Sequence, residues 1–395
     1  MMPTNADGLM PFRQNNDLLY LSGVDQEESI LVIFPEANNP KHREILFVKE
    51  TSELIAIWEG EKLNKESATK QSGIQTIYWL TDFEQVFHGL AIEAERIYLN
   101  QNEHLRAAKT VQTCDDRFRA ECKAKYPDHE YERLAPIMST IRPIKSQLEI
   151  DTMQQACDIT DKGFRRILDF VKPGVMEYEI EAEFAHEFLR NRSRGFAYTP
   201  IIASGYNACV LHYIENNMEC KAGDVILMDV GCEYANYASD MTRCVPVSGK
   251  FTDRQKDVYN AVLRVMKGAT SMLVPGTDHE EYHGEVGKMM ESELLGLGLI
   301  DKTDIANQDK SNPAYKKYFM HGTSHHIGLD VHDVENRATP FSEGMILTVE
   351  PGIYIPGENL GIRLENDVLI TKDGQHDLMR NIPLEAEEIE DLMNR

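Results

Sequence analysis

The chain has 395 residues, of which 41 are lysine or arginine and 65 are aspartate or glutamate, so its formal net charge at pH 7 is −24. This charge argues against nonspecific binding to nucleic acid or to an anionic membrane, because both require a basic surface. No apolar run approaches the roughly 18 residues of a membrane span, so no membrane association is expected. The composition favours a soluble enzyme.

The seven cysteines contain no C-x-x-C pair, which argues against both a disulfide framework and a zinc knuckle. The N-terminus, MMPTNADGLMPF, has neither the basic region nor the apolar core of a signal peptide. We therefore expect a protein of the reducing cytoplasm. The length is sufficient for two domains with sizeable cores.

The first part of the chain predicts a small α/β domain. Between residues 12 and 142, short apolar runs alternate with helical patterns, which is typical of a largely covered sheet. The expected elements are strands at Ser29–Phe34, Ile45–Val48, Leu54–Trp58 and Arg96–Leu99, and helices at Asp82–His88 and Asp115–Lys125.

A domain boundary is expected at Arg142-Pro143, between an N-terminal domain of residues 1–142 and a second domain of residues 143–395. A capping box formed by Ser146 and Glu149 starts the first helix of the second domain. The elements expected after that helix are a helix at Glu177–Asn191, a strand at Pro200–Tyr213, helices at Asp253–Leu273 and Glu280–Leu297, a polar loop at Asp301–Pro313, a last strand at Asp367–Thr371 and a closing helix at Leu384–Met393.

Two segments of the second domain, Gly223–Gly249 and Gly344–Gly374, repeat the same spacing of glycines and acids. In both, an acid stands six residues after the first glycine, and a second acid stands nine residues before the last glycine. The positions that correspond in the two segments are Asp229 and Glu350, Gly231 and Gly352, and Asp240 and Glu365, and a tyrosine, Tyr234 or Tyr354, follows soon after the first acid of each. Such an internal repeat predicts two related halves.

The first acid of each pair follows an apolar run, Val225–Met228 or Met345–Val349, that is typical of a buried strand. A carboxylate at the end of a buried strand is desolvated at considerable cost unless a cation or hydrogen bonds compensate. For one such acid, a solvated surface position would be the simpler interpretation. Four acids in matched register indicate metal ligands instead.

A histidine-rich segment, HGTSHHIGLDVHD at residues 321–333, lies between the two acid pairs. Neutral imidazole is a good ligand for Zn, Mn, Fe or Co. Because His325 and His326 are adjacent, they would point to opposite faces of an extended segment, and only one of them is expected to bind the metal.

The charges balance for a site with two metal ions. Four carboxylates carry −4 and two divalent ions carry +4, and an oxygen-rich set with one histidine suits Mn²⁺ or another hard-to-borderline ion. Two such ions roughly 3.5–4 Å apart can hold a hydroxide between them and polarise a carbonyl group. The residues therefore predict a metal-assisted hydrolase.

Five ordered motifs carry a resemblance to a known family: LHYIEN, MDVGCEY followed by YASDMTR, HGTSHHIGLDVHD, TVEPGIY and GIRLEND. They resemble aminopeptidase P, the Xaa-Pro aminopeptidase branch of the metallopeptidases that also include prolidase, methionine aminopeptidase and creatinase. The resemblance extends to FRQNNDLLYLSG near the N-terminus.

This resemblance implies an α/β (α+β) chain with a creatinase-like N-terminal domain and a pita-bread catalytic domain of internal pseudo-twofold symmetry. Chains of the family normally begin with a further helix and strand, so the first strand of the small domain is expected to be missing here.

The resemblance also implies roles for individual residues. The five metal ligands would be Asp229, Asp240, His325, Glu350 and Glu365, with Asp240 and Glu365 bridging two divalent ions. The ions would be Mn²⁺, with Zn, Co or Fe as alternatives. The other residues implied at the site are His212 and His332 on the substrate side, the supporting Arg363, and the lining residues His321 and Tyr354.

The expected reaction is removal of the first residue from peptides that carry proline in the second position. Attack by a metal-bridging hydroxide is expected, with Glu350 carrying the proton to the departing nitrogen. The resemblance further implies a homodimer or homotetramer.

Three alternatives differ in how well the residues support them. Prolidase, which cleaves only Xaa-Pro dipeptides, remains open. An inactive family member that acts as a binding protein is disfavoured by the complete ligand set. Methionine aminopeptidase is disfavoured because its chains generally lack the N-terminal domain.

Overall fold

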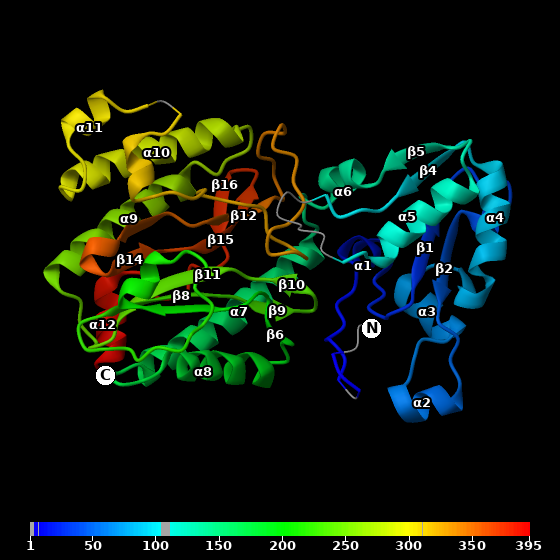
Figure 1. Cartoon of the computed structure of the whole chain (residues 1–395), viewed down its shortest axis with the longest axis horizontal. Coiled ribbons are helices and arrows are strands. Elements are labelled where there is room, and N and C mark those ends of the chain that lie inside the picture. Colours follow the sequence, from blue (N-terminus) through cyan, green and yellow to red (C-terminus); the bar gives the residue numbers. More distant parts are fainter. Residues whose placement is uncertain (1–3, 7, 104–110, 310) are drawn as a thin grey trace. The chain divides into compact units, whose positions relative to one another are not determined.

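The computed structural model describes residues 4–6, 8–103, 111–309 and 311–395, and the chain divides into two compact units, Met1–Ser139 and Thr140–Arg395 (Figure 1). Arg142, which the sequence assigned to the first domain, lies in the second unit. There its guanidinium donates to Asp330 at 2.9 Å and to Asp333 at 2.5 Å.

The first unit contains a three-stranded sheet and a pair of parallel strands. The sheet has the order β1-β2-β3, in which β1 (Ile30–Ile33) is antiparallel to β2 (Glu44–Val48) and β2 is parallel to β3 (Thr76–Trp79). The pair consists of β4 (Arg96–Leu99) and β5 (Glu130–Arg133). The helices are α1 (Asn16–Ser22), α2 (Glu53–Glu59), α3 (Lys65–Ser72), α4 (Phe83–Glu93) and α5 (Cys114–Lys125), and α6 (Ala135–Ile141) spans the boundary.

The prediction of a strand at Leu54–Trp58 is wrong, because these residues form helix α2. The Ser52 hydroxyl accepts a hydrogen bond from Ile55 N–H at 3.2 Å and caps the helix, a role that serine favours. Ile57 and Trp58 are 77% and 81% exposed, so this apolar run covers no core. Strands β3 and β5 were not predicted.

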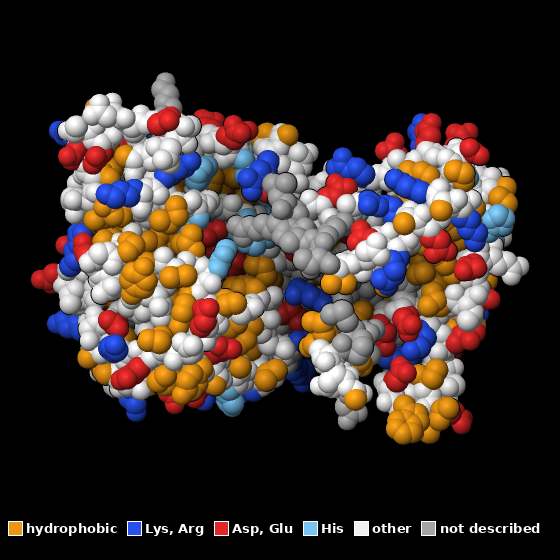
Figure 2. Space-filling model, viewed as in Figure 1, with side chains coloured by type: hydrophobic (Ala, Val, Ile, Leu, Met, Phe, Trp, Pro, Cys, Tyr) orange, Lys and Arg blue, Asp and Glu red, His pale blue; other side chains and the backbone are white. Residues whose placement is uncertain are grey.

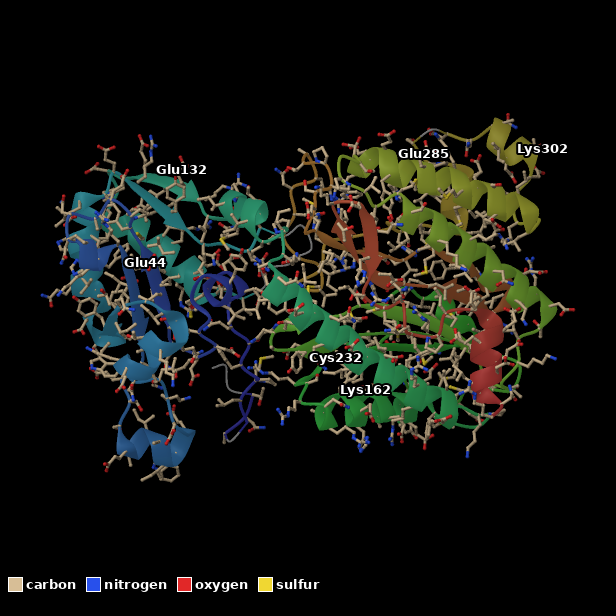
Figure 3. All side chains as sticks on the ribbon, turned by 180° about the vertical axis from the view of Figure 1, so that it is seen from behind. Glu44, Glu132, Lys162, Cys232, Glu285 and Lys302 are labelled. Atoms are coloured by element: carbon tan, nitrogen blue, oxygen red, sulfur yellow. The ribbon has the colours of Figure 1, made fainter. Side chains whose placement is uncertain are left out.

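The second unit is a sandwich of strands between two helix pairs. Figure 1 shows the strands between α7 (Gln147–Phe170) and α8 (Glu177–Arg190) on one side and α9 (Asp253–Ser271) and α10 (His279–Gly296) on the other. Glu285 on α10 lies on the outer face, as does Lys302 on the short helix α11 (Lys302–Ala306) (Figure 3). Helix α12 (Ala386–Met393) closes the chain.

The strands of the second unit form three antiparallel three-stranded sheets and one two-stranded sheet. The orders are β11-β8-β7, β12-β15-β16, β10-β9-β6 and β13-β14. The bounds are β6 (Gly195–Phe196), β7 (Ile201–Ser204), β8 (Val225–Val230), β9 (Cys232–Tyr234), β10 (Tyr237–Ala238), β11 (Met241–Pro246), β12 (Ile346–Val349), β13 (Gly352–Ile355), β14 (Leu360–Arg363), β15 (Asn366–Thr371) and β16 (Gly374–Asp377).

Three predicted elements of this unit need correction. The strand expected at Pro200–Tyr213 ends at Ser204, because a 3-10 helix, η3 (Gly205–Cys209), follows it. The loop expected at Asp301–Pro313 contains α11, whose N-terminal N–H groups at Thr303 and Asp304 are capped by the Asp301 carboxylate. The strand ending at Thr371 is not the last, since β16 pairs with it.

The two acid-bearing segments fold as related hairpins, as their repeated spacing predicts. Strand β8 pairs with β11 around the small β9–β10 hairpin, and β12 pairs with β15 around the β13–β14 hairpin. In each segment, the position two residues after the first acid requires glycine. A Cβ at Gly231 would lie 1.7 Å from the Ser239 carbonyl oxygen, and one at Gly352 would lie 2.7 Å from the Tyr354 hydroxyl.

One continuous apolar core lies under these strands and helices, and it includes buried residues of β8, β11 and β12. None of the helices in the described part of the chain combines the length and hydropathy that a membrane crossing requires.

Candidate active site

The two hairpins bring acids and a histidine together at one point of the second unit. One ligand atom from each of Asp240, His325 and Glu365 lies within 4.8 Å of the others. Asp240 precedes β11, Glu365 precedes β15, and His325 comes from the histidine-rich segment between the hairpins. All three are buried, with exposures of 5%, 8% and 2%. Several histidines gather on one face of this unit (Figure 2).

Asp229 joins this group through shared hydrogen-bond donors. The Tyr198 hydroxyl lies 2.6 Å from Asp229 Oδ1 and 2.5 Å from Asp240 Oδ1. The other oxygen of Asp229 accepts from Arg363 Nη2 at 2.5 Å. Both aspartates are therefore held in fixed orientations.

Glu365 is oriented by a second network on the neighbouring strand. Its Oε2 accepts from the Thr242 hydroxyl at 2.7 Å, and Thr242 in turn accepts from Arg363 Nε at 3.1 Å. Arg363 Nη1 donates to the Tyr354 hydroxyl at 2.9 Å. The guanidinium therefore connects the two hairpins through three different partners.

His325 is held with one ring nitrogen facing the carboxylates. Its Nδ1 lies 3.0 Å from the His326 carbonyl oxygen, which can only accept, so the proton sits on Nδ1. In the neutral ring Nε2 then carries the lone pair, and it lies 3.5 Å from Asp240 Oδ2 and 3.7 Å from Glu350 Oε1. This tautomer is the one that a metal-ligating Nε2 requires.

Glu350 has the least restrained carboxylate of the four. It follows β12, and its Oε2 lies 3.7 Å from His321 Nδ1. Within the described part of the chain, its side chain forms no hydrogen bond. His321 itself is fixed, since its Nε2 lies 2.8 Å from the Tyr354 hydroxyl.

The pKa values of the acids show the electrostatic cost of this arrangement. Burial raises the pKa of Glu350 to about 7, although the charges of His325 and Arg363 act in the opposite direction. Burial, together with the charges of Asp240 and Glu350, raises the pKa of Glu365 well above its usual value. Burial also raises the pKa of Asp240. Buried like charges of this kind are stable when a cation compensates them.

His325 shows the reverse effect. Burial lowers its pKa, but the hydrogen bond with Asp240 and the charges of Glu350 and Asp240 outweigh burial and raise the pKa to about 9. Without a metal ion, protonated His325 would therefore supply part of the missing positive charge.

The other predicted site residues lie at different distances from this centre. The His332 ring stacks on the His325 ring, with centroids 3.8 Å apart and an interplanar angle of 26°. The Tyr354 side chain is fully buried between His321 and Arg363. His212 is exposed in the turn after η3, and no contact with a described residue places it at the acids.

His326 faces away from the acids, as its adjacency to His325 predicts. Its ring centroid lies 5.7 Å from that of His279, the first residue of α10. Only His325 of this pair joins the carboxylate cluster.

Three supporting residues were missed by the sequence analysis: Tyr198, Thr242 and Asp367. The Asp367 carboxylate accepts from the Asp240 backbone N–H at 3.0 Å. Thr242 and Asp367 each stand two residues after a predicted ligand, so the period of two in an extended segment could have identified them. Tyr198 lies in the loop between β6 and β7, where no pattern points to it.

The donor set fits divalent metal ions. Four carboxylates and the His325 imidazole lie together, and burial raises the pKa values of three of the acids, with their mutual repulsion adding to this effect. Oxygen-rich sets with imidazole suit Mn²⁺, Co²⁺, Fe²⁺ and Zn²⁺. The assignment of each ligand remains a prediction.

Comparison with known families agrees with the motifs in both units. Residues 151–372 match the model of metallopeptidase family M24, and residues 1–98 match the model of the aminopeptidase P N-terminal domain. The M24 match contains all five predicted metal ligands.

Individual relatives are similar over nearly the whole chain. The chain is 35% identical to the Xaa-Pro aminopeptidase of Escherichia coli, over 98% of this chain and 90% of that protein. Among solved structures, proline aminopeptidase P II from Yersinia pestis matches with a TM-score of 0.88 and 33% identity, covering 99% of this chain and 92% of that one. Zinc-substituted E. coli aminopeptidase P in complex with product matches with a TM-score of 0.86 and 34% identity, covering 99% and 91%.

Proposed function

Because the chain belongs to metallopeptidase family M24 and is a metallo-aminopeptidase, we propose that it removes the N-terminal residue from peptides with proline in the second position. The observation that carries this proposal is the convergence of both acid pairs and His325 at the ends of two related hairpins. The 35% identity to an Xaa-Pro aminopeptidase over 98% of the chain supports the substrate class.

We further propose that two divalent ions bind at this centre, with Mn²⁺ as the working metal. Asp229, Asp240, His325, Glu350 and Glu365 would hold them. When bound, the ions would supply a hydroxide nucleophile at neutral pH and polarise the peptide carbonyl group.

The protein's own residues would orient the substrate and move the proton. Glu350 forms no hydrogen bond with the described residues, so its carboxylate is available to accept a proton and pass it to the departing nitrogen. His332, which stacks on His325, would donate to the carbonyl oxygen as negative charge develops there. His212 would reach the same oxygen from its exposed turn.

The remaining predicted residues would act on the walls of the site. His321 and Tyr354 hydrogen-bond each other 2.8 Å apart and would line the space beside Glu350. Proline has no backbone N–H, so a site that accepts it must recognise the ring by its shape. The free amino group of the substrate would direct cleavage to the first peptide bond.

We also propose a cytoplasmic location and a homodimer or homotetramer. All seven cysteines are free and six of them are at least partly buried, which fits a reducing compartment. The oligomer rests on the resemblance to aminopeptidase P, and light scattering after gel filtration would measure it.

The decisive experiment compares an Xaa-Pro-Xaa tripeptide with an Xaa-Pro dipeptide, using chelator-stripped protein with and without Mn²⁺. We expect Mn²⁺-dependent release of the first residue from the tripeptide. Cleavage of the dipeptide alone would identify a prolidase instead. No cleavage of either peptide by metal-loaded protein would show a binding role.

A further inference from the structure

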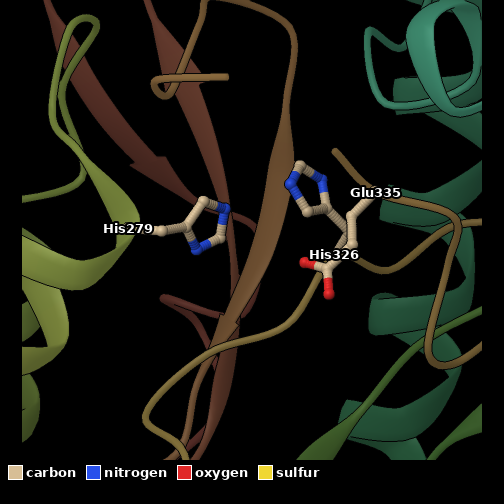
Figure 4. A group of neighbouring side chains, drawn as sticks. All are labelled: His279, His326 and Glu335. Atoms are coloured by element: carbon tan, nitrogen blue, oxygen red, sulfur yellow. The ribbon is translucent and has the colours of Figure 1, made fainter. Parts of the chain in front are cut away.

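A second cluster of metal-ligating side chains lies outside the acid centre, in the same unit. One ligand atom from each of His279, His326 and Glu335 lies within 4.8 Å of the others. The three come from separate segments: the start of α10, the histidine-rich segment, and the loop that follows His332 (Figure 4). Figure 4 shows the two rings and the carboxylate converging on one space.

Two atoms of this cluster are buried without a partner. His326 is 2% exposed, and its Nδ1 forms no hydrogen bond with any described residue. Oε2 of Glu335 is likewise buried and without a hydrogen-bond partner among the described residues. Buried polar atoms are rarely left unsatisfied, because they have lost their hydrogen bonds to water without gaining others. Orphan atoms on two converging ligands therefore indicate a missing partner.

The rest of each side chain is already held in place. Glu335 Oε1 accepts from Arg337 Nε at 2.7 Å, which leaves Oε2 for another partner. The His279 ring packs edge-on against the Phe341 ring, with centroids 4.5 Å apart. The cluster is therefore fixed before any ligand binds.

The backbone explains why His326 points here. Its carbonyl oxygen accepts from Asp333 N–H at 2.8 Å, and the residue forms an isolated antiparallel bridge with Leu347 of β12. Neighbouring side chains of an extended segment point to opposite sides, so His325 faces the acids while His326 faces α10. One short segment thus contributes a histidine to each of two clusters.

We propose that His279, His326 and Glu335 bind a single borderline divalent ion such as Zn²⁺, at a site separate from the Asp240–His325–Glu365 centre. Two imidazoles and one carboxylate suit zinc, and three protein ligands leave a position for water. An oxygen-seeking ion such as Mg²⁺ or Ca²⁺ would find too few oxygen ligands here.

The ion would act as a structural clamp. It would join the start of α10 to both ends of the segment 326–335, which contains His332. Because the His332 ring stacks on His325 at 3.8 Å, the clamp would fix the loop that faces the acid centre without contributing to the chemistry.

The test counts and locates zinc in chelator-stripped protein that has been reloaded with Zn²⁺ and dialysed. We compare the wild type with His279→Ala and Glu335→Gln, the second of which changes the ligand but keeps the side-chain shape. His283→Ala is the matched control, because His283 lies one turn further along α10 and contacts Thr323 instead. Crystals soaked in Zn²⁺ and measured at the zinc absorption edge locate each ion.

We expect an anomalous peak between the three side chains in the wild type and in His283→Ala. His279→Ala should bind one zinc ion fewer per chain and lose this peak while keeping the peaks at the acid centre, and Glu335→Gln should bind zinc here at least tenfold more weakly. The proposal is overturned if the wild type shows no peak at this place, or if His279→Ala retains the full zinc content. These outcomes are independent of peptide cleavage.

Discussion

The two acid-bearing hairpins share a register but hold their carboxylates in different ways. In the first, Asp229 and Asp240 share the Tyr198 hydroxyl, and Asp229 also accepts from Arg363. In the second, Glu365 accepts from the Thr242 hydroxyl, but Glu350 forms no side-chain hydrogen bond with any described residue, although it lies 3.7 Å from nitrogens of His321 and His325.

This difference indicates a division of roles between Glu350 and the other three acids. Short aspartate side chains fixed by strong donors are suited to hold a metal ion in one position. A longer glutamate without a hydrogen bond to the described residues is suited to move a proton. The predictions below test this division, beginning with the largest expected effect.

Replacing Glu350 with Gln removes the proposed proton carrier and nearly preserves the side-chain shape. General acid–base catalysis typically contributes about 10²–10⁴-fold, so we expect kcat for an Xaa-Pro-Xaa tripeptide to fall by about that factor. Metal content is measured in the same samples, with Glu358→Gln in η5 (Pro356–Glu358) as an exposed control that should keep normal activity. Near-normal turnover in Glu350→Gln with its metal intact would remove Glu350 from this role.

Metal removal should destabilise the protein more at high pH than at low pH. In the metal-free protein the pKa of Glu350 rises from 4.5 to about 7, and that of His325 from 6.5 to about 9. Both groups have a higher pKa in the folded state than in the unfolded state. The contribution of Glu350 to stability is therefore complete below pH 4.5 and is lost as the pH rises through about 7, and that of His325 is complete below pH 6.5 and is lost as the pH rises through about 9.

Thermal unfolding with and without Mn²⁺ measures this effect. At 100 times its Kd a ligand stabilises the folded state by about 2.7 kcal/mol, and we expect the shift in Tm on adding Mn²⁺ to be larger at pH 8 than at pH 6. Part of that difference also arises because protons compete with the metal for its ligands. Equal shifts in Tm at pH 6 and pH 8 would contradict the proposal that the carboxylates of the metal-free centre destabilise the fold as they lose their protons.

Tyr198→Phe tests the rigid half of the comparison. Removing the shared hydroxyl leaves both aspartates less well oriented, and loss of such a supporting hydrogen bond typically weakens metal affinity about 10–100-fold. Tyr206→Phe is the control, since Tyr206 is 57% exposed. Calorimetric titration of chelator-stripped protein with Mn²⁺ measures the affinity. An unchanged Kd would show that Tyr198 does not position the ligands.

The spacing of the sequence was sufficient to predict the paired hairpins and the acids that they bring together. Glycine and acid positions repeat because both halves need the same strand ends and the same close backbone approach at Gly231 and Gly352. The capping box at Ser146 was also predictable, because it depends on residues three apart in the sequence.

The remainder depends on contacts between distant residues. Tyr198 is 42 positions from Asp240, and nothing local distinguishes it from other tyrosines. His279 and His326 meet only when α10 packs beside the histidine-rich segment. Leu54–Trp58 was mistaken for a strand because a short apolar run does not show whether it is buried.

The weakest effect is expected for the tyrosines that follow the first acid of each pair, Tyr234 and Tyr354. Tyr354 is fully buried, accepts from Arg363 Nη1 at 2.9 Å and lies 2.8 Å from His321 Nε2, whereas Tyr234 is only partly buried. Tyr354→Phe leaves a buried guanidinium N–H without its acceptor, so we expect a loss of about 1.5 kcal/mol in the free energy of unfolding. Tyr234→Phe should change it by less than about 0.5 kcal/mol. Urea unfolding of both metal-free variants measures the difference. Equal losses would mean that the Tyr354 hydroxyl contributes no more to the stability of the fold than the Tyr234 hydroxyl does. The proposed division of roles would then rest on the acids alone.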